Sequence, residues 1–299
     1  MSWRLLLPVG FLALFAAVLA VAAWEPWASQ ERERELAWLE AYAAWSDRID
    51  AGLDGGDSYA AANCAETYAA EVGEPPARLA GAGRIALAGC RRLSRSVTST
   101  SGDPGGWGDV RHEVLADLTE RRTEAAAPAR SRELAVRAAP LADTRPEVLC
   151  WTSADWDELN EEWQLIDLGE FWVVGFADAD TDRVHLAPHV CDPLHRFFGS
   201  DYAPNLNEES LVLAEALVTL AHEAEHLRSP DAPEADVECV AIQRVRDLVR
   251  AAGRGQAYED LMTGLAWDVG YPDVPPEYRT ERCEDGGELD VRPATTVFP

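Results

Sequence analysis

Lysine is absent from this chain of 299 residues, and basic charge is scarce. The 26 basic residues are all arginine, whereas 53 aspartates and glutamates bring the formal net charge to −27. A nucleic-acid-binding protein needs a basic surface to neutralise phosphates, so this composition excludes that class. The same negative charge excludes electrostatic attraction to a surface of anionic lipid.

Charge of either sign is missing from one long run, Leu5 to Ala23, which follows Arg4 and precedes two tryptophans. About 20 apolar residues span a bilayer core, and tryptophan favours its interface. Because the basic flank is N-terminal, we expect residues 1–27 to form a single-pass transmembrane anchor, with the remaining chain extracytoplasmic. The alternative is a cleaved signal peptide, since Ala20-Val21-Ala22 offers a small-residue cleavage site, and the protein would then be secreted.

The cysteines are few and even in number, as expected of disulfides in an oxidising compartment. Spacing alone leaves many pairings open, and we predict the sequential one. The pairs would be Cys64–Cys90, Cys150–Cys191 and Cys239–Cys283. The first is the best supported, because both of its cysteines lie in expected helices joined by a Gly-Glu-Pro-Pro turn.

Residues 28–145 are expected to form an α-helical extracytoplasmic module that spaces, shields or binds. The first helix is expected over 29–50, where aromatic and aliphatic residues recur on one face. The residues of this apolar stripe are Trp38, Tyr42, Trp45 and Ile49. Further helices are expected over 57–71, 76–93, 110–125 and 133–138, with a Gly- and Ser-rich loop at 96–109. We interpret His112 as a surface residue.

From residue 146 onward the pattern changes to mixed α and β. A short strand is expected over 147–151, and a helix capped by Ser153 extends to Trp163. The strongest β signal is a hairpin formed by 171–176 and 183–188, with the polar turn ADADTD between them. A short helix is expected over 192–198.

The segment LAHEAEHL near the end of a long helix, 207–227, contains the motif HExxH. On a helix, His222 and His226 lie one turn apart on one face, so both imidazoles can bind one zinc ion. Glu223 lies about 100° around the helix from His222 and could hold a water as general base without being a ligand. We therefore predict a catalytic zinc site with Glu223 as base.

The third ligand is expected from the next helix, 233–252, which carries Glu234 and Glu238 one turn apart. Carboxylates on an otherwise apolar face need a cation or hydrogen bonds to offset their burial. Because the turn at Pro230 is short, the helices should form a hairpin that places Glu234 level with His226 and Glu238 level with His222. We assign Glu234 to the metal and Glu238 to supporting His222, and the reverse assignment stays open.

The motif and the two glutamates after it resemble the gluzincin zinc metallopeptidases. The resemblance implies that Glu234 is the third ligand, on a glutamate helix, and that an edge strand of a small sheet receives the substrate backbone. Residues 146–252 are also similar to membrane-anchored proteins of high-GC bacteria. The interval between His226 and the glutamates is shorter than in thermolysin-like enzymes.

A tyrosine or histidine that would stabilise the transition state is not evident from the sequence. The candidates are His185, His189 and Tyr202. We interpret His185 as a structural histidine, because it alternates with apolar residues on an expected strand, and none of the three is included in the predicted site.

The expected fold is α+β, mostly α, in four parts: an anchor (1–27), a helical module (28–145), a zincin-like domain (146–270) and a Pro-rich tail (271–299). The expected function is that of a membrane-anchored, zinc-dependent peptidase acting on a peptide or protein outside the cytoplasm. Two alternatives stay open. One is a catalytically inactive binding or structural protein of the envelope, and the other is a metal-dependent hydrolase of a non-peptide bond.

Overall fold

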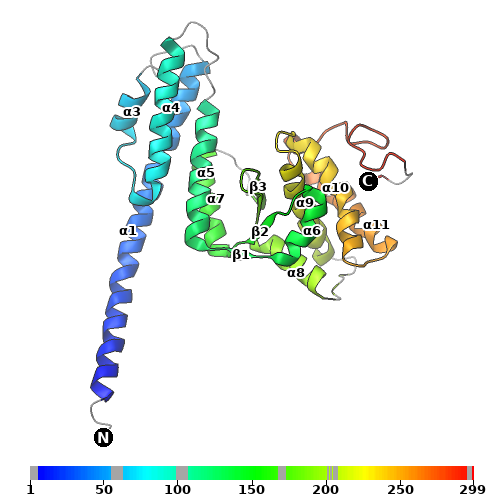
Figure 1. The fold of residues 1–299 in the computed structure, drawn as a ribbon, viewed down its shortest axis with the longest axis horizontal. Helices are drawn as coiled ribbons and strands as arrows, with labels where there is room; N and C mark the ends of the chain where they lie inside the picture. The colour runs from blue at the N-terminus through cyan, green and yellow to red at the C-terminus, as the bar shows by residue number, and fades with distance from the viewer. Residues whose placement is uncertain are drawn as a thin grey trace. The chain divides into compact units, whose positions relative to one another are not determined.

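The computed structural model describes residues 6–54, 63–98, 107–167, 173–200, 202, 204, 208–294 and 298–299. The chain divides into two compact units (Figure 1). Unit 1 comprises Met1–Ala125 and Leu159–Phe171, and unit 2 comprises Ala126–Glu158 and Trp172–Pro299. The fold is mostly helical α+β with one small mixed sheet, which confirms the predicted class.

Unit 1 is helical. Its elements are α1 (Leu6–Asp54), α3 (Cys64–Glu71), the 3-10 turn η2 (Ala77–Leu79), α4 (Ala80–Thr98), α5 (Trp107–Ala126) and the part of α7 (Ser153–Asp167) from Leu159 onward. The predicted apolar stripe of residues 38–49 is buried in its core. Trp45 packs edge-on against Tyr68 of α3 and Trp107 of α5.

Several helix limits in unit 1 differ from the prediction. The predicted helix over 29–50 is the C-terminal part of α1, and the described part of the predicted helix over 57–71 begins at Cys64. The predicted loop at 96–109 lies partly outside the described residues, and its limits are wrong at both ends, because α4 continues to Thr98 and α5 starts at Trp107. Trp107 is 1% exposed and donates a hydrogen bond to Ser46, which draws it into the core.

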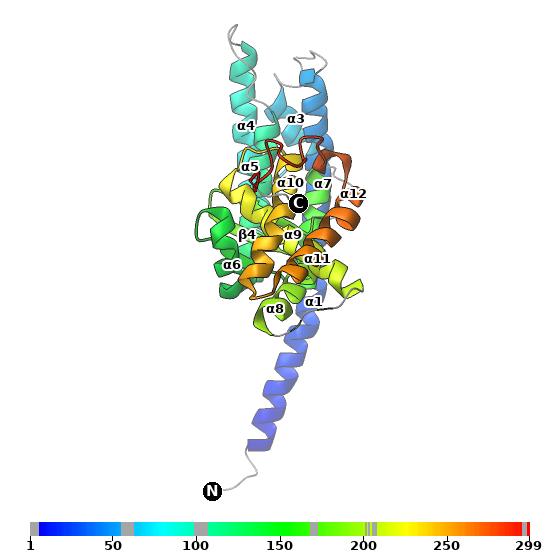
Figure 2. The ribbon, with the colours of Figure 1, turned by 90° about the vertical axis from the view of Figure 1, so that its right-hand side faces the viewer.

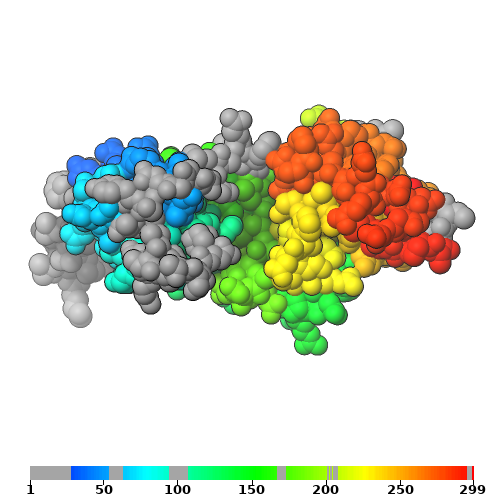
Figure 3. All heavy atoms as spheres, turned by 90° about the horizontal axis from the view of Figure 1, so that it is seen from above, coloured from blue at the N-terminus to red at the C-terminus, as the bar shows by residue number. Residues whose placement is uncertain are grey.

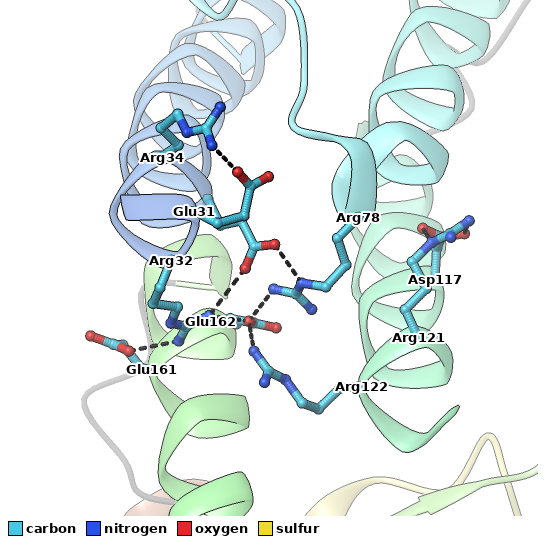
Figure 4. Close-up of polar contacts among 10 residues, drawn as sticks. Glu31, Arg32, Arg34, Arg78, Asp117, Arg121, Arg122, Glu161 and Glu162 are labelled. Carbon is cyan, nitrogen blue, oxygen red and sulfur yellow. Dashed lines mark hydrogen bonds and ion pairs between the residues drawn. The ribbon is translucent and has the colours of Figure 1, made fainter. Parts of the chain in front are cut away.

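A buried carboxylate ties four helical segments of unit 1 together (Figure 4). Oε1 of Glu162, on α7, accepts hydrogen bonds from Arg32 of α1, Arg78 of η2 and Arg122 of α5. Arg78 also donates to Glu35 of α1 at 2.9 Å. Glu162 is 0% exposed, and a charge at such a position is tolerated because opposite charges and hydrogen bonds surround it.

Unit 2 contains a four-stranded sheet in the order β1-β2-β4-β3. Its strands are β1 (Ala129–Arg130), β2 (Glu147–Cys150), β3 (Gly175–Asp178) and β4 (Arg183–Leu186). The pair β2–β4 is parallel, whereas β1–β2 and β3–β4 are antiparallel. The predicted strand at 147–151 is present as β2, and the predicted hairpin is present as β3 and β4.

The predicted limits of the first hairpin strand, 171–176, were wrong, because β3 covers Gly175–Asp178. Residues 171–172 of the predicted strand lie outside the described residues. The Asp178 carboxylate accepts hydrogen bonds from the backbone N–H groups of Asp180 and Thr181. This turn closes directly after Asp178, so the strand pairing continues up to it.

The helices of unit 2 surround α9 (Glu208–Arg228), which contacts both strands of the hairpin and four other helices. These are α6 (Arg132–Ala142), α8 (Pro188–Gly199), α10 (Glu234–Ala251) and α11 (Gln256–Leu265). Helices α9, α10 and α11 pack against one another (Figure 2). A π-helical turn η3 (Ala266–Gly270), α12 (Tyr271–Asp273) and η4 (Pro276–Tyr278) follow.

Three helix starts in unit 2 correct the prediction. The helix predicted over 192–198 begins at Pro188, whose fixed φ suits a first helical turn. Thr152, and not Ser153, caps α7, because its Oγ1 accepts a hydrogen bond from the Asp155 N–H. Helix α11 was not predicted.

Three disulfides join Cys64–Cys90, Cys150–Cys191 and Cys239–Cys283, which confirms the sequential pairing. The third joins α10 to the C-terminal segment, which is mostly irregular as predicted. Arg282 of this segment forms an ion pair with Asp236 of α10. Figure 3 shows the segment, orange to red, against the yellow turn between α9 and α10.

Within the described residues, no helix is long and apolar enough to cross a membrane. The predicted anchor at 1–27 falls on residues 1–5, which lie outside the description, and on residues 6–27, of which only the helical backbone of α1 is described.

Candidate metal centre

The HExxH segment lies in the last turns of α9, which ends at Arg228. The short turn after it contains a hydrogen bond from the Ala232 N–H to the Ser229 carbonyl at 3.0 Å. Helix α10 then begins at Glu234, directly after Pro233. The end of α9 and the start of α10 therefore lie side by side, and they place histidines opposite glutamates.

Three side chains bring their donor atoms together at this hairpin. Nε2 of His222 lies 3.0 Å from Nε2 of His226. Oε2 of Glu234 lies 3.1 Å from the first of these nitrogens and 3.2 Å from the second. The three atoms, two imidazole nitrogens and one carboxylate oxygen, therefore form a nearly equilateral triangle.

The separations in this triangle can be compared with those that a tetrahedral zinc ion would require. Zinc binds histidine nitrogen and carboxylate oxygen at about 2.0–2.2 Å, so ligand atoms of a tetrahedral ion lie about 3.4 Å apart. The separations here are a few tenths of an ångström shorter, and a small outward movement of the side chains accommodates the ion. Two histidines and one glutamate also leave one tetrahedral position for water or substrate, as catalytic zinc sites do.

Glu238 occupies a different position from Glu234. Its Oε2 lies 2.8 Å from Nδ1 of His222, on the side of the ring away from the triangle. A carboxylate there fixes the tautomer and the orientation of a ligating histidine. The predicted roles of Glu234 as ligand and Glu238 as supporting residue stay predictions, and this geometry is their support.

The carboxylates at this centre affect the pKa of His222. Burial alone would lower the pKa of His222, but hydrogen bonds to Glu234 and Glu238 raise it to about 10. Hydrogen bonds from His222 and His226 in turn lower the pKa of Glu234 to about 2. A metal cation therefore competes with a proton for a site whose negative partners are already in place.

Glu223 lies one residue from His222 and is only 6% exposed. Burial raises the pKa of its carboxyl group above the ordinary value. The backbone of β3 approaches it closely at Gly175. A Cβ at that glycine would lie 3.1 Å from Oε1 of Glu223 and 2.9 Å from Cγ2 of Thr219, so glycine is the residue that fits.

Strand β3 is the terminal strand of the sheet among the described residues. The Ala187 N–H donates to the Val174 carbonyl, so position 174 faces β4. Backbone groups alternate in direction along an antiparallel strand, and those of Gly175 and Ala177 therefore point away from β4. At Gly175, β3 lies next to the Glu223 carboxylate.

Tyr278 is a residue of this site that the sequence analysis missed. Its ring centroid lies 5.8 Å from that of His222. Burial raises the pKa of Tyr278 to about 12, and the nearby carboxylates, Glu234 foremost, add to the increase. The phenol therefore stays protonated at neutral pH and offers an O–H donor beside the histidines.

The signal for Tyr278 was present in the cysteine pattern. Once Cys239 of α10 is paired with Cys283, the residues just before Cys283 must lie beside α10 and its glutamates. The Tyr271 hydroxyl also accepts a hydrogen bond from the Thr280 N–H at 3.0 Å, which folds the intervening segment back on itself.

The three other candidates lie in different surroundings. His185 is 1% exposed, its Nδ1 accepts a hydrogen bond from the Trp151 indole, and its ring stacks on Phe176. This environment agrees with the structural role expected from the sequence. His189 is exposed, and the ring of Tyr202 lies under the guanidinium of Arg196.

No protein-family model, no curated protein and no solved structure matches the chain. The functional interpretation therefore depends on the residues and geometry of the chain itself.

Proposed function

We propose that the chain is a zinc-dependent peptidase whose metal ligands are His222, His226 and Glu234. The observation that supports this most directly is the meeting of their three donor atoms within 3.2 Å of one another. When bound there, zinc supplies Lewis-acid chemistry, which polarises a carbonyl group and lowers the pKa of water.

Glu223 is the general base in this proposal. Its carboxylate takes a proton from the water whose oxygen attacks the carbonyl carbon of the peptide. When the C–N bond breaks, the same carboxyl group returns the proton to the leaving nitrogen, so the products are an amine and a carboxylic acid, which then releases its proton to solvent. The buried position beside Gly175 supports this role, since it shields the proton from bulk solvent.

The substrate backbone pairs with the edge of β3 that faces away from β4 in this account. The outward backbone groups of Gly175 and Ala177 would bind an extended peptide by main-chain hydrogen bonds, which suits many sequences. The hydroxyl of Tyr278 would donate a hydrogen bond to the carbonyl oxygen as it gains negative charge. The protonated phenol beside His222 supports this assignment.

We also propose that the protein acts outside the cytoplasm, held by its apolar N-terminal segment. The three disulfides support this placement, because such bonds persist in oxidising compartments.

The proposal is tested with Glu223→Gln, which keeps the size of the side chain and removes the base. Wild-type protein and variant are loaded with zinc and incubated with an unfolded protein substrate, and new amino termini are identified by mass spectrometry. We expect zinc binding in both proteins and cleavage by the wild type alone. Equal cleavage by both would contradict the role of Glu223, and absence of cleavage despite bound zinc would favour the inactive binding protein.

A further inference from the structure

The disulfide between β2 and α8 has a histidine beside it. His195 lies one helical turn after Cys191 on α8, and its Nε2 is 3.6 Å from Sγ of Cys150. The other ring nitrogen, Nδ1, lies 3.9 Å from Oε2 of Glu133 on α6. Carboxylate, imidazole and sulfur therefore follow one another in a row, contributed by three different elements.

The two cysteines of this disulfide differ in exposure. Cys191 is 2% exposed, whereas Cys150 is partly exposed and the His195 side chain is 42% exposed. The disulfide of unit 1 is different, because Cys64 and Cys90 are both 0% exposed. Within this pair Cys150 is therefore the more exposed residue, whereas both cysteines of the unit 1 pair are fully buried.

We propose that Cys150–Cys191 is a redox-reactive disulfide that exchanges with a dithiol partner, and that His195 holds and returns the proton of Cys150. This inference goes beyond the peptidase centre, which takes no part in it. The partner is identified by chemistry alone, as a protein or small molecule with two neighbouring thiols.

The exchange proceeds in two steps. A thiolate of the partner attacks Sγ of Cys150, the Cys150–Cys191 bond breaks, and its electron pair leaves on Cys191, which then takes up a proton. The second thiolate of the partner attacks the partner's own sulfur in the mixed disulfide and releases Cys150 as a thiolate. The partner loses two electrons and two protons and gains a disulfide, while the protein gains two electrons and two protons.

The surroundings of Cys150 favour its release. A neighbouring imidazole that can become imidazolium stabilises a thiolate, and a thiol beside such a group ionises more readily than an ordinary one. Among the described residues, the His195 ring lies near Glu133 of α6, Cys150 of β2 and Cys191 of α8. Oε2 of Glu133 lies near Nδ1, the other nitrogen of the ring, and would orient Nε2 toward Cys150.

The first test is graded reduction of the native full-length chain with dithiothreitol. Free thiols are trapped by acid, alkylated and located by peptide mass spectrometry. We expect Cys150 and Cys191 to be reduced at least about ten-fold faster than the buried pair Cys64–Cys90, which is the internal control. Reduction of both pairs at one rate would overturn the proposal.

The second test separates the role of His195 from simple exposure. The alkylation rate of Cys150 in the reduced protein is measured against pH for wild type, His195→Gln and Glu133→Gln. An ordinary thiol titrates near pH ~8.5, and we expect the wild-type midpoint to lie about one pH unit or more below this. In His195→Gln it should return to the ordinary value, with about a ten-fold lower rate at neutral pH, and Glu133→Gln should lie between.

Identical profiles in all three proteins would overturn the role of His195. Near-UV circular dichroism establishes that each variant is folded. If His195→Gln fails to fold, Glu133→Gln tests the arrangement of Glu133, His195 and Cys150 instead. A pH profile of Cys150 alkylation in Glu133→Gln that matches the wild type would also contradict the proposal.

Discussion

Nδ1 of His222 lies 2.8 Å from Oε2 of Glu238, so the helix after the HExxH helix fixes the orientation of its first histidine. With Nδ1 held in this way, Nε2 is directed toward His226 and Glu234. The hairpin of α9 and α10 thus supplies both the donor atoms and the support that aligns one of them.

Substitution of Glu238 tests this relationship. We expect Glu238→Ala to lower zinc affinity by about 10–100-fold while one zinc ion still binds at saturation, because the ligands stay and their alignment is lost. Competition with a chromophoric chelator measures the change, and Asp231→Ala, in the exposed turn between the helices, is the control. Loss of zinc as complete as in Glu234→Ala would favour the reverse assignment of the two glutamates.

Tyr278 should affect the chemical step and leave zinc binding unchanged. In Tyr278→Phe we expect kcat to fall by roughly 10²–10³, with KM and zinc content unchanged, because a donor to the developing oxyanion is lost. Tyr258→Phe is the control, since that hydroxyl bonds to the Pro204 carbonyl instead. A kcat within about two-fold of wild type would remove Tyr278 from the mechanism.

The stability of unit 1 should depend on Glu162. Glu162→Gln removes the counter-charge that Arg32, Arg78 and Arg122 share, and we expect it to lower the free energy of unfolding by about 3–5 kcal/mol. Glu161→Gln is the matched control on the same helix, because the Glu161 side chain is 52% exposed and its ion pair with Arg32 should contribute less than about 1 kcal/mol. Urea unfolding of both variants decides, and equal changes would refute the role of Glu162.

The same carboxylate makes unit 1 sensitive to acid. Burial opposes the charge of Glu162, but Arg78 and Arg122 outweigh this effect and lower its pKa. Its contribution to stability is thus fully present above the pKa of the unfolded state and is lost as the pH falls through the folded value.

Unit 2 should be destabilised by acid through His185. Burial lowers the pKa of His185 from 6.5 to about 3. Between these values the unfolded chain binds a proton that the folded chain does not, so stability falls with falling pH by up to about 1.4 kcal/mol per pH unit. His185→Gln keeps an acceptor for Trp151 and should flatten this slope in urea unfolding between pH 4 and 7. An unchanged slope would contradict the account.

The HExxH helix and both glutamates were predictable because their signals are local. A spacing of four residues places side chains on one helical face. Because the turn at Pro230 is short, the two helices that it joins must pack against each other. The buried aromatic stripe of α1 was predictable for the same reason, since it depends on helical periodicity alone.

Features that depend on distant contacts were missed. Strand β1 has only two residues and exists through its pairing with β2, and no periodicity can be read from so short a segment. Tyr278 reaches the site through Cys239–Cys283 and through hydrogen bonds of an irregular segment, neither of which leaves a repeating pattern. Similarly, the partners of Glu162 come from positions 32, 78 and 122.

The measurement that tests the central claim most directly is the metal content of the purified chain. Mass spectrometry of native protein incubated with zinc and then dialysed gives the number of ions per chain for wild type, Glu223→Gln and His226→Ala. The account predicts one zinc ion in the first two proteins and none in the third. A folded wild-type chain without zinc, or a His226→Ala variant that retains it, would contradict the metal centre and the peptidase proposal with it.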